Sequence, residues 1–221
     1  MLPTKNRAAF IPHAIKSYQS QTYPRRELII VDNGNDGTAR LIPKDDPTIR
    51  YWYVPIPQST GAMRNICATH AEGQILCHFD SDDWSAPDRV ADQVHRLGLR
   101  GVVTGYHSVL FFEGQSHHCY QWQSATYPVT YAAGTSLCYR KAWWQGHPFR
   151  PLQIGEDTRF FLDAYREART HVTTAPAGHR LVVLVHDQQT SIKSLNKRSC
   201  KQVPVTKLPA AYPYANPLAI G

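Results

Sequence analysis

Residues 75–84 are Ile-Leu-Cys-His-Phe-Asp-Ser-Asp-Asp-Trp, an apolar run that ends in the carboxylates Asp80, Asp82 and Asp83. Carboxylates crowded at a strand end repel one another unless positive charge lies among them. A divalent cation bound by hard oxygen ligands is one source of that charge. The alternative is an acidic turn before the next helix, because Pro87 follows in a helix-start pattern. The stretch alone leaves both interpretations open.

Strand and helix signals alternate around this stretch. Apolar runs that stop at polar or turn residues predict strands, and apolar residues at helical spacing predict helices. The expected strands are 27–31, 49–54 and 74–79, and the expected helices are 10–18, 59–70 and 87–99. Residues 1–4 resemble only the end of a strand, so the first strand is either minimal or continues upstream. This alternation predicts an α/β, Rossmann-like domain with a mostly parallel central sheet flanked by helices.

In such sheets ligands bind beyond the carboxyl ends of the strands. Asp32 and Asn33 follow one expected strand, and 80–83 follows another, so both should lie at the same rim. The second half of the chain has a different pattern and predicts a small antiparallel portion. Its expected strands are 102–112, 135–140 and 180–185, with a helix over 154–168.

Composition favours one globular protein. The chain has 221 residues, of which 42% are hydrophobic and 19% charged, which excludes a disordered chain. No apolar stretch approaches the length of a membrane span, and no signal-peptide core is evident. The five cysteines form no C-x-x-C pair, so we expect them to be reduced and the protein to be cytoplasmic. A soft metal site at 117–119 is disfavoured because no second ligand pair accompanies it.

The net charge of +7 is concentrated near the C-terminus, where residues 193–221 hold five basic residues and no acid. The basic residues are Lys193, Lys197, Arg198, Lys201 and Lys207. We therefore expect a domain over 1–192 and a basic, proline-containing tail over 193–221. Such a tail is either solvated or contacts an anionic surface, for example the inner face of a membrane. We do not expect a nucleic-acid partner.

Five segments, taken in order, resemble the pattern of family 2 glycosyltransferases of the GT-A type. They are Pro3-Thr4-Lys5-Asn6-Arg7, the stretch 20–34, Gly61-Ala62-Met63-Arg64-Asn65 with Ala71-Glu72-Gly73, Asp80-Ser81-Asp82-Asp83, and Gly155-Glu156-Asp157 with Arg159-Phe160-Phe161. Each segment is weak alone, but the ordered set from about residue 3 to 165 is specific. The resemblance implies transfer of a sugar from a nucleotide sugar to an acceptor hydroxyl, with inversion at the anomeric carbon. It also implies Mn²⁺ or Mg²⁺, a nucleotide-binding half over about 1–100 and an acceptor half over about 101–192.

The resemblance also assigns roles to residues. It makes Asp82 and Asp83 the metal ligands, which His186 could complete, and it makes Asp157 the general base with Glu156 as its helper. Without the resemblance, Glu156 and Asp157 would simply favour a helix N-terminus. The expected nucleotide-binding residues are Pro3, Thr4, Arg7, Asp32, Asn33, Arg64 and Asp80.

Two of these positions leave alternatives open. Asn33 replaces the second acid of the commoner Asp-Asp-Gly pattern, and its amide can both accept from and donate to a pyrimidine. UDP- or dTDP-sugars are therefore the favoured donors. Arg64 either pairs with the diphosphate or is an ordinary surface arginine of its helix.

The acceptor is not identified by any motif. The candidate aromatic residues for an acceptor site or for the core are Trp84, Trp122, Trp143 and Trp144. Two other functions compete with glycosyl transfer. A sugar nucleotidyltransferase is disfavoured because 3–7 contains no glycine for a phosphate loop. A non-catalytic polyanion-binding module is disfavoured because Asp82, Asp83 and Asp157 occur together.

Overall fold

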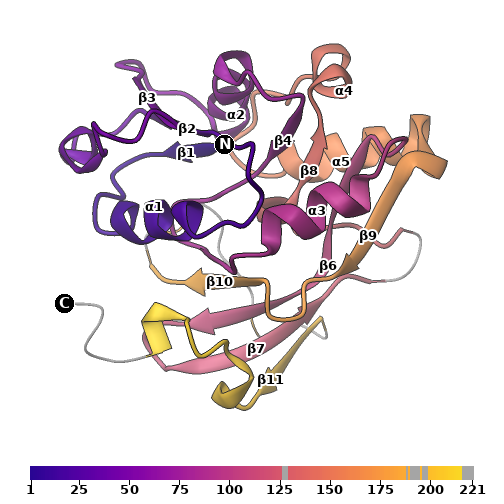
Figure 1. The fold of residues 1–221 in the computed structure, drawn as a ribbon. Helices are drawn as coiled ribbons and strands as arrows, with labels where there is room; N and C mark the ends of the chain where they lie inside the picture. The colour runs from indigo at the N-terminus through magenta and orange to yellow at the C-terminus, as the bar shows by residue number, and fades with distance from the viewer. Residues whose placement is uncertain (126–128, 188, 190–194, 196–198, 216–221) are drawn as a thin grey trace.

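The computed structural model describes residues 1–125, 129–187, 189, 195 and 199–215. In these residues a three-stranded and an eight-stranded sheet form the centre of an α/β fold (Figure 1). The first sheet is parallel throughout, in the order β1-β2-β3. Its strands are β1 (Leu2–Thr4), β2 (Leu28–Asp32) and β3 (Ile49–Tyr53). All five residues of β2 are buried, as expected for a central parallel strand.

Strand β4 (Ile75–Cys77) joins the two sheets. The amino group of Met1 donates to the carbonyl oxygen of Cys77 at 2.8 Å, and the N–H of Phe79 donates to the carbonyl oxygen of Met1 at 2.9 Å. On its other side β4 pairs with β8 (Cys138–Arg140). The acidic stretch after β4 therefore starts between the two sheets, next to β1.

The second sheet is mixed, with β11-β7-β6-β10-β5 as its main path. Strand β6 pairs in parallel with β9 and β10 but antiparallel with β7 and β8. The strands are β5 (Trp84–Ser85), β6 (Val103–Glu113), β7 (His118–Gln123), β9 (Val172–Pro176), β10 (Leu181–Val185) and β11 (Cys200–Val203). The α/β prediction is confirmed, although the antiparallel part is larger than expected. A short turn connects β6 to β7, which forces these strands to be antiparallel.

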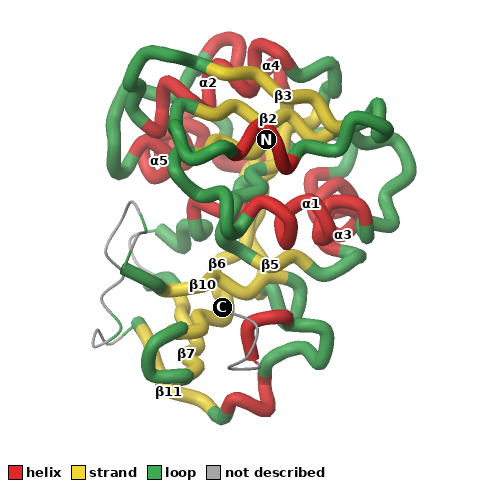
Figure 2. The backbone as a smooth tube through the Cα atoms, turned by 90° about the vertical axis from the view of Figure 1, so that its left-hand side faces the viewer, coloured by secondary structure: helices red, strands yellow, loops and turns green. Residues whose placement is uncertain are grey.

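Helices flank both sheets (Figures 1 and 2). They are α1 (Ile11–Gln19), α2 (Thr60–His70), α3 (Arg89–Leu97), α4 (Lys141–Gly146) and α5 (Glu156–Glu167). Ser59 caps α2, because its side chain accepts from the N–H of Ala62 at 3.3 Å. None of the helices in the described ranges is both long and apolar enough to cross a membrane.

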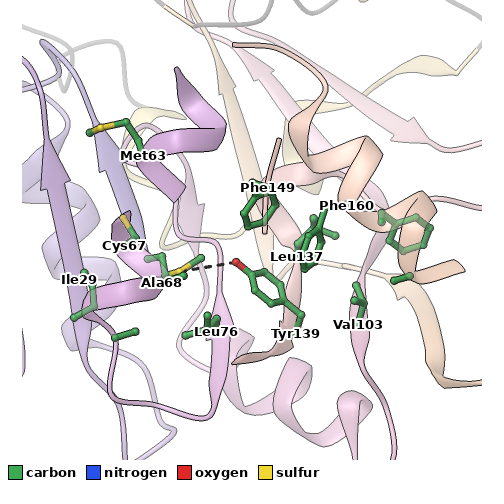
Figure 3. Close-up of a cluster of buried hydrophobic side chains, with 14 of the residues drawn as sticks. Ile29, Met63, Cys67, Ala68, Leu76, Val103, Leu137, Tyr139, Phe149 and Phe160 are labelled. Atoms are coloured by element: carbon green, nitrogen blue, oxygen red, sulfur yellow. Dashed lines mark hydrogen bonds between the residues drawn. The ribbon is translucent and has the colours of Figure 1, made fainter. Parts of the chain in front are cut away.

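A buried aromatic cluster fixes α5 against β8 (Figure 3). The rings of Phe149 and Phe160 stack with centroids 4.4 Å apart, and the ring of Tyr139 lies 4.6 Å from that of Phe160. Such ring pairs contribute about 0.5–1.5 kcal/mol each beyond the area they bury. Because Phe160 is one turn along α5, this packing fixes where the helix begins and hence where Asp157 lies.

The described part of the basic tail packs on the eight-stranded sheet. Strand β11 pairs antiparallel with β7, and Leu208, Tyr212 and Tyr214 are buried against β6 and β10. Lys201 and Lys207 are exposed. The other basic residues of the tail, Lys193, Lys197 and Arg198, lie outside the described residues. All five cysteines are free thiols, as predicted.

Candidate active site

A cleft of about 530 Å³ lies beyond the carboxyl ends of β1, β2 and β4. It is lined by most of the residues that the sequence singled out. These are Pro3, Thr4, Arg7, Asn33, Arg64, Asp80, Asp82, Asp83, Glu156 and Asp157. Asp32 and His186 do not line the cleft, although His186 contacts the lining residue Asp82. The structure therefore brings the acidic stretch after β4 and the start of α5 to one cleft.

Each carboxylate of the acidic stretch has a partner. Asp82 forms an ion pair with Arg7, and its Oδ2 lies 3.0 Å from Nε2 of His186. Asp83 accepts a hydrogen bond from the Thr135 hydroxyl. These contacts offset the mutual repulsion of the acids and hold their oxygens at the cleft wall.

The chemistry of these side chains fits a hard cation, with one restriction. In the part of the chain that the structure describes, no three His, Cys, Asp or Glu side chains are grouped closely enough to hold a metal ion. Mg²⁺ is usually bound by one or two carboxylates together with substrate phosphates rather than by an all-protein cage. Asp82 and Asp83, which both line the cleft, could supply that partial set of oxygens.

Arg64 links the acidic stretch after β4 to helix α5. Its side chain is only 5% exposed, and it donates to Oε1 of Glu156 at 3.2 Å and to Oδ1 of Asp80 at 3.2 Å. Burial alone would lower the pKa of the Arg64 guanidinium, but the two carboxylates raise it above its ordinary value. Burial also raises the pKa of the Glu156 carboxyl, against the opposing effect of Arg64. Arg64 is thus a buried cross-link between α2 and α5, rather than a surface arginine.

Asp157 stands at the first turn of α5, where its Oδ1 accepts from the N–H of Thr158 at 2.6 Å. Its Oδ2 lies so close to Gly134 that a Cβ atom added to this glycine would be only 1.5 Å from it. Gly134 begins the short 3₁₀ turn Gly134–Ser136, and Thr135 in the same turn contacts Asp83. This one turn therefore touches both the candidate base and the acidic stretch.

Two buried side chains that sequence reasoning missed hold this turn in place. Nδ1 of His78 lies 2.6 Å from the carbonyl oxygen of Gly134. Arg89 donates to the carbonyl oxygens of His78 and Thr135, at 2.7 and 2.8 Å. Burial, followed by the Arg64 charge, lowers the pKa of His78 well below its usual value, while Asp80 acts in the opposite direction. A neutral His78 therefore donates from Nδ1 to the turn.

At the other end of the cleft, two buried polar atoms lack a hydrogen-bond partner among the described residues. They are Oγ1 of Thr4 and Nδ2 of Asn33, at the ends of β1 and β2. The carboxylate of Asp32, by contrast, has partners within the protein: it accepts hydrogen bonds from the N–H of Gly34 at 2.7 Å and from the Tyr51 hydroxyl at 3.0 Å. A buried polar group without a partner is costly, so Thr4 and Asn33 mark a place where a ligand can complete the bonding.

The tryptophans separate into two groups. Trp122 lines the cleft, together with Tyr131. Trp144 instead donates from Nε1 to Asn65 at 2.9 Å, and Trp143 stacks on His147 with ring centroids 3.6 Å apart. Neither Trp143 nor Trp144 lines the cleft, and Trp84 belongs to the core beneath the tail.

Comparison with known proteins places this arrangement in context. The family model described as glycosyl transferase family 2 matches residues 1–141. An uncharacterized glycosyltransferase of Haemophilus influenzae is 24% identical over 78% of this chain and 73% of its own length. A putative colanic acid biosynthesis glycosyl transferase of Escherichia coli is 33% identical over 41% of this chain and 34% of its own length.

Solved structures share the fold. TarS 1–349 of S. aureus in complex with UDP-GlcNAc superposes with a TM-score of 0.63 at 17% identity, over 86% of this chain and 58% of TarS. A mannosyltransferase of Pyrobaculum calidifontis in complex with GDP-Man and Mn²⁺ gives a TM-score of 0.63 at 18% identity, over 83% of this chain and 55% of its own. The chain spans less than two thirds of both structures.

Proposed function

This chain belongs to glycosyl transferase family 2, and from that premise we propose that it transfers a sugar from a nucleoside-diphosphate sugar to an acceptor hydroxyl, with inversion. One observation carries the proposal. Asp82 and Asp83 share a single cleft with Asp157, and the turn Gly134–Ser136 contacts both Asp83 and Asp157. Such a cleft can hold the leaving group and the incoming alcohol at the same time.

The leaving group is a nucleoside diphosphate, on which negative charge develops as the glycosidic bond breaks. A bound Mn²⁺ or Mg²⁺ would act as a Lewis acid on the diphosphate oxygens. Asp82 and Asp83 are proposed to hold the cation, with His186 fixing the carboxylate of Asp82 through their 3.0 Å contact. Arg7, already paired with Asp82, adds positive charge beside the phosphates.

Asp157 is the proposed general base. Inversion in one step needs a base on the face opposite the leaving group. As the new bond forms between the acceptor oxygen and the anomeric carbon, Asp157 takes the hydroxyl proton and the departing diphosphate keeps the electron pair of the broken bond. Glu156 keeps Arg64 paired and so holds the start of α5 in position.

Nucleotide recognition is assigned to the other end of the cleft. Thr4 and Asn33 are proposed to bond the base with their unpartnered buried atoms, while Pro3 borders the same space and Asp32 holds the turn that carries Asn33. Arg64 and Asp80, which pair with each other, are proposed to face the ribose and diphosphate. UDP and dTDP are the favoured nucleotides, since UDP-GlcNAc is bound by TarS, although a neighbour that binds GDP-Man makes GDP a necessary comparison.

A nucleotide screen tests the proposal. Thermal unfolding is measured with UDP, dTDP, GDP and ADP, each with and without Mn²⁺, because a ligand that binds the folded state raises its apparent stability by about 2.7 kcal/mol at a hundred times its Kd. We expect stabilisation by a uridine or thymidine diphosphate that depends on Mn²⁺. Release of pyrophosphate from a nucleoside triphosphate and a sugar 1-phosphate would instead identify a nucleotidyltransferase. Absence of any nucleotide effect would refute the proposal.

The basic tail suggests where the protein acts. We propose that residues 193–207, which include the exposed Lys201 and Lys207, bring the protein to an anionic lipid surface on the cytoplasmic side, because each basic residue near such a surface adds about 1 kcal/mol of attraction. Co-sedimentation with vesicles containing phosphatidylglycerol should fall when Lys201 and Lys207 are both changed to Gln. Unchanged co-sedimentation would remove the proposal.

A further inference from the structure

The acceptor end of the cleft contains an aromatic platform made of Phe111, Trp122 and Tyr131. Phe111 lies on β6 and Trp122 on β7, with ring centroids 6.2 Å apart and planes 17° from parallel. Tyr131 meets Trp122 edge to face, with centroids 5.8 Å apart. Phe111 is buried, whereas Trp122 and Tyr131 are half-buried and line the cleft. The pairing of β6 with β7 places Trp122 on the same face as Phe111, since Trp122 lies opposite Val109, two residues from Phe111.

The chain connects this platform directly to the proposed base. Tyr131 is three residues before Gly134, so their Cα atoms are at most about 11 Å apart. Gly134 is in contact with Asp157. The platform and Asp157 therefore line one cleft and are joined by a short stretch of chain.

The charges along the cleft favour a neutral ligand at this end. Of the described residues that line it, the basic ones are Lys5, Arg7 and Arg64, and the last two are paired with carboxylates. The segment 129–135, which runs from the platform to the turn, contains no charged residue. A phosphorylated acceptor would need positive side chains near its phosphate, and among the described residues neither the platform nor the segment 129–135 supplies one.

We propose that the acceptor is a neutral saccharide whose ring stacks on Trp122. The apolar C–H face of a pyranose complements the negative face of an aromatic ring, and the sugar's hydroxyl groups remain directed to the polar side of the cleft, which Gln153, Asp157 and Thr158 line. This inference rests on the proposed function and specifies its acceptor. Trp122 is the residue that selects and orients the acceptor, and it has no part in nucleotide binding.

Binding and transfer to simple probes test the proposal. Methyl glycosides of glucose, galactose, mannose and N-acetylglucosamine are compared with glycerol 3-phosphate and 3-phosphoglycerate as acceptors, using the donor whose nucleotide gives the strongest thermal shift. Saturation-transfer NMR measures glycoside binding independently of turnover. The variants are Trp122→Ala and Trp122→Phe. Trp52→Ala is the control, because Trp52 is a half-buried tryptophan that stacks on His70 outside the cleft.

We expect at least one glycoside to bind and to be used, with the KM for that glycoside about tenfold or more higher in Trp122→Ala. Trp122→Phe should recover most of the loss, Trp52→Ala should behave as the native protein, and the nucleotide-dependent thermal shift should be the same in all four proteins. Preference for a phosphorylated acceptor, or native-like glycoside binding by Trp122→Ala, would overturn the platform proposal. A native protein without any nucleotide response would instead contradict the proposed function, and the NMR comparison would still decide on the platform.

Discussion

The proposed nucleotide end and the proposed acceptor end of the cleft differ in the side chains that line them. At the nucleotide end, polar side chains follow short parallel strands, and ion pairs such as Arg7–Asp82 and Arg64–Asp80 hold them. At the acceptor end, the rings of Phe111 and Trp122 project from the antiparallel strands β6 and β7. Of the acids among the described lining residues, Asp80, Asp82 and Asp83 belong to the acidic stretch and Glu156 pairs with Arg64, which leaves Asp157. On the proposed function, this difference means that charge would orient the donor, whereas aromatic contacts would orient the acceptor. Substitutions at the two ends should therefore have separable effects.

The largest expected effect is at the nucleotide end. Asp82→Asn and Asp83→Asn each remove a carboxylate charge that could hold a cation, so Mn²⁺-stimulated turnover should fall about a thousandfold, as expected from the loss of several kcal/mol of charge stabilisation. Turnover is measured as nucleoside diphosphate released at saturating donor with increasing Mn²⁺. Asp88→Asn is the control, because Asp88 pairs with Arg180 and lies outside the cleft. Retained Mn²⁺ stimulation in both variants would show that the cation binds elsewhere.

The buried ion pair between Arg64 and Glu156 connects α2 to the start of α5. Glu156→Ala leaves Arg64, 4% exposed, with only part of its compensating charge, and the free energy of unfolding should fall by about 3 kcal/mol. Urea denaturation measures this change. Glu167→Ala, on the same helix, removes a half-exposed partner of His147 and should cost less than about 1 kcal/mol. Equal effects of the two variants would mean that the Arg64–Glu156 contact does not hold α5.

A substitution at Gly134 tests whether transfer depends on the position of the Asp157 carboxylate. A Cβ at Gly134 would overlap the carboxylate of Asp157, whereas at Gly146 it would meet nothing within 4 Å. Gly134→Ala should therefore displace Asp157 and slow transfer about a hundredfold. Gly146→Ala should transfer at the native rate. A fully active Gly134→Ala protein would show that the position of Asp157 against this turn is not required.

A smaller effect concerns pH and the buried His78. Its pKa is lowered in the folded protein, so below about pH 6.5 the unfolded chain binds a proton that the folded chain does not. Stability should then fall as the pH decreases from about 6.5, with a contribution of up to about 1.4 kcal/mol per pH unit from this one residue.

The comparison of His78→Gln with the native protein isolates this contribution. His78→Gln keeps an N–H donor for Gly134 but cannot titrate, so its stability should depend less steeply on pH between 6.5 and 5 in urea denaturation. His95→Gln, at an exposed position of α3, should keep the native slope. An unchanged slope in His78→Gln would mean that folding does not lower the pKa of His78.

The same contrast explains what could be predicted from the sequence. Helix 59–70 was expected and α2 is Thr60–His70, and the polar residues after β2 and β4 were expected to share a rim, because strand ends leave local signals. The contact of His78 with Gly134 joins residues 56 positions apart, and no local pattern encodes it. Residue type also could not separate Trp122 from Trp143, since the strand pairing of β6 and β7 decides which ring lines the cleft.

The most direct test of the central claim is the Asp157→Asn variant. Single-turnover transfer and the Kd of the nucleoside diphosphate with Mn²⁺ are measured in this variant, in the native protein and in Asp163→Asn, whose carboxylate lies outside the cleft on the same helix and pairs with Arg150. We predict that Asp157→Asn binds the nucleotide as the native protein does, while its transfer rate falls by about 10²–10⁴-fold, and that Asp163→Asn is unaffected in both. Transfer at the native rate by Asp157→Asn would contradict the account.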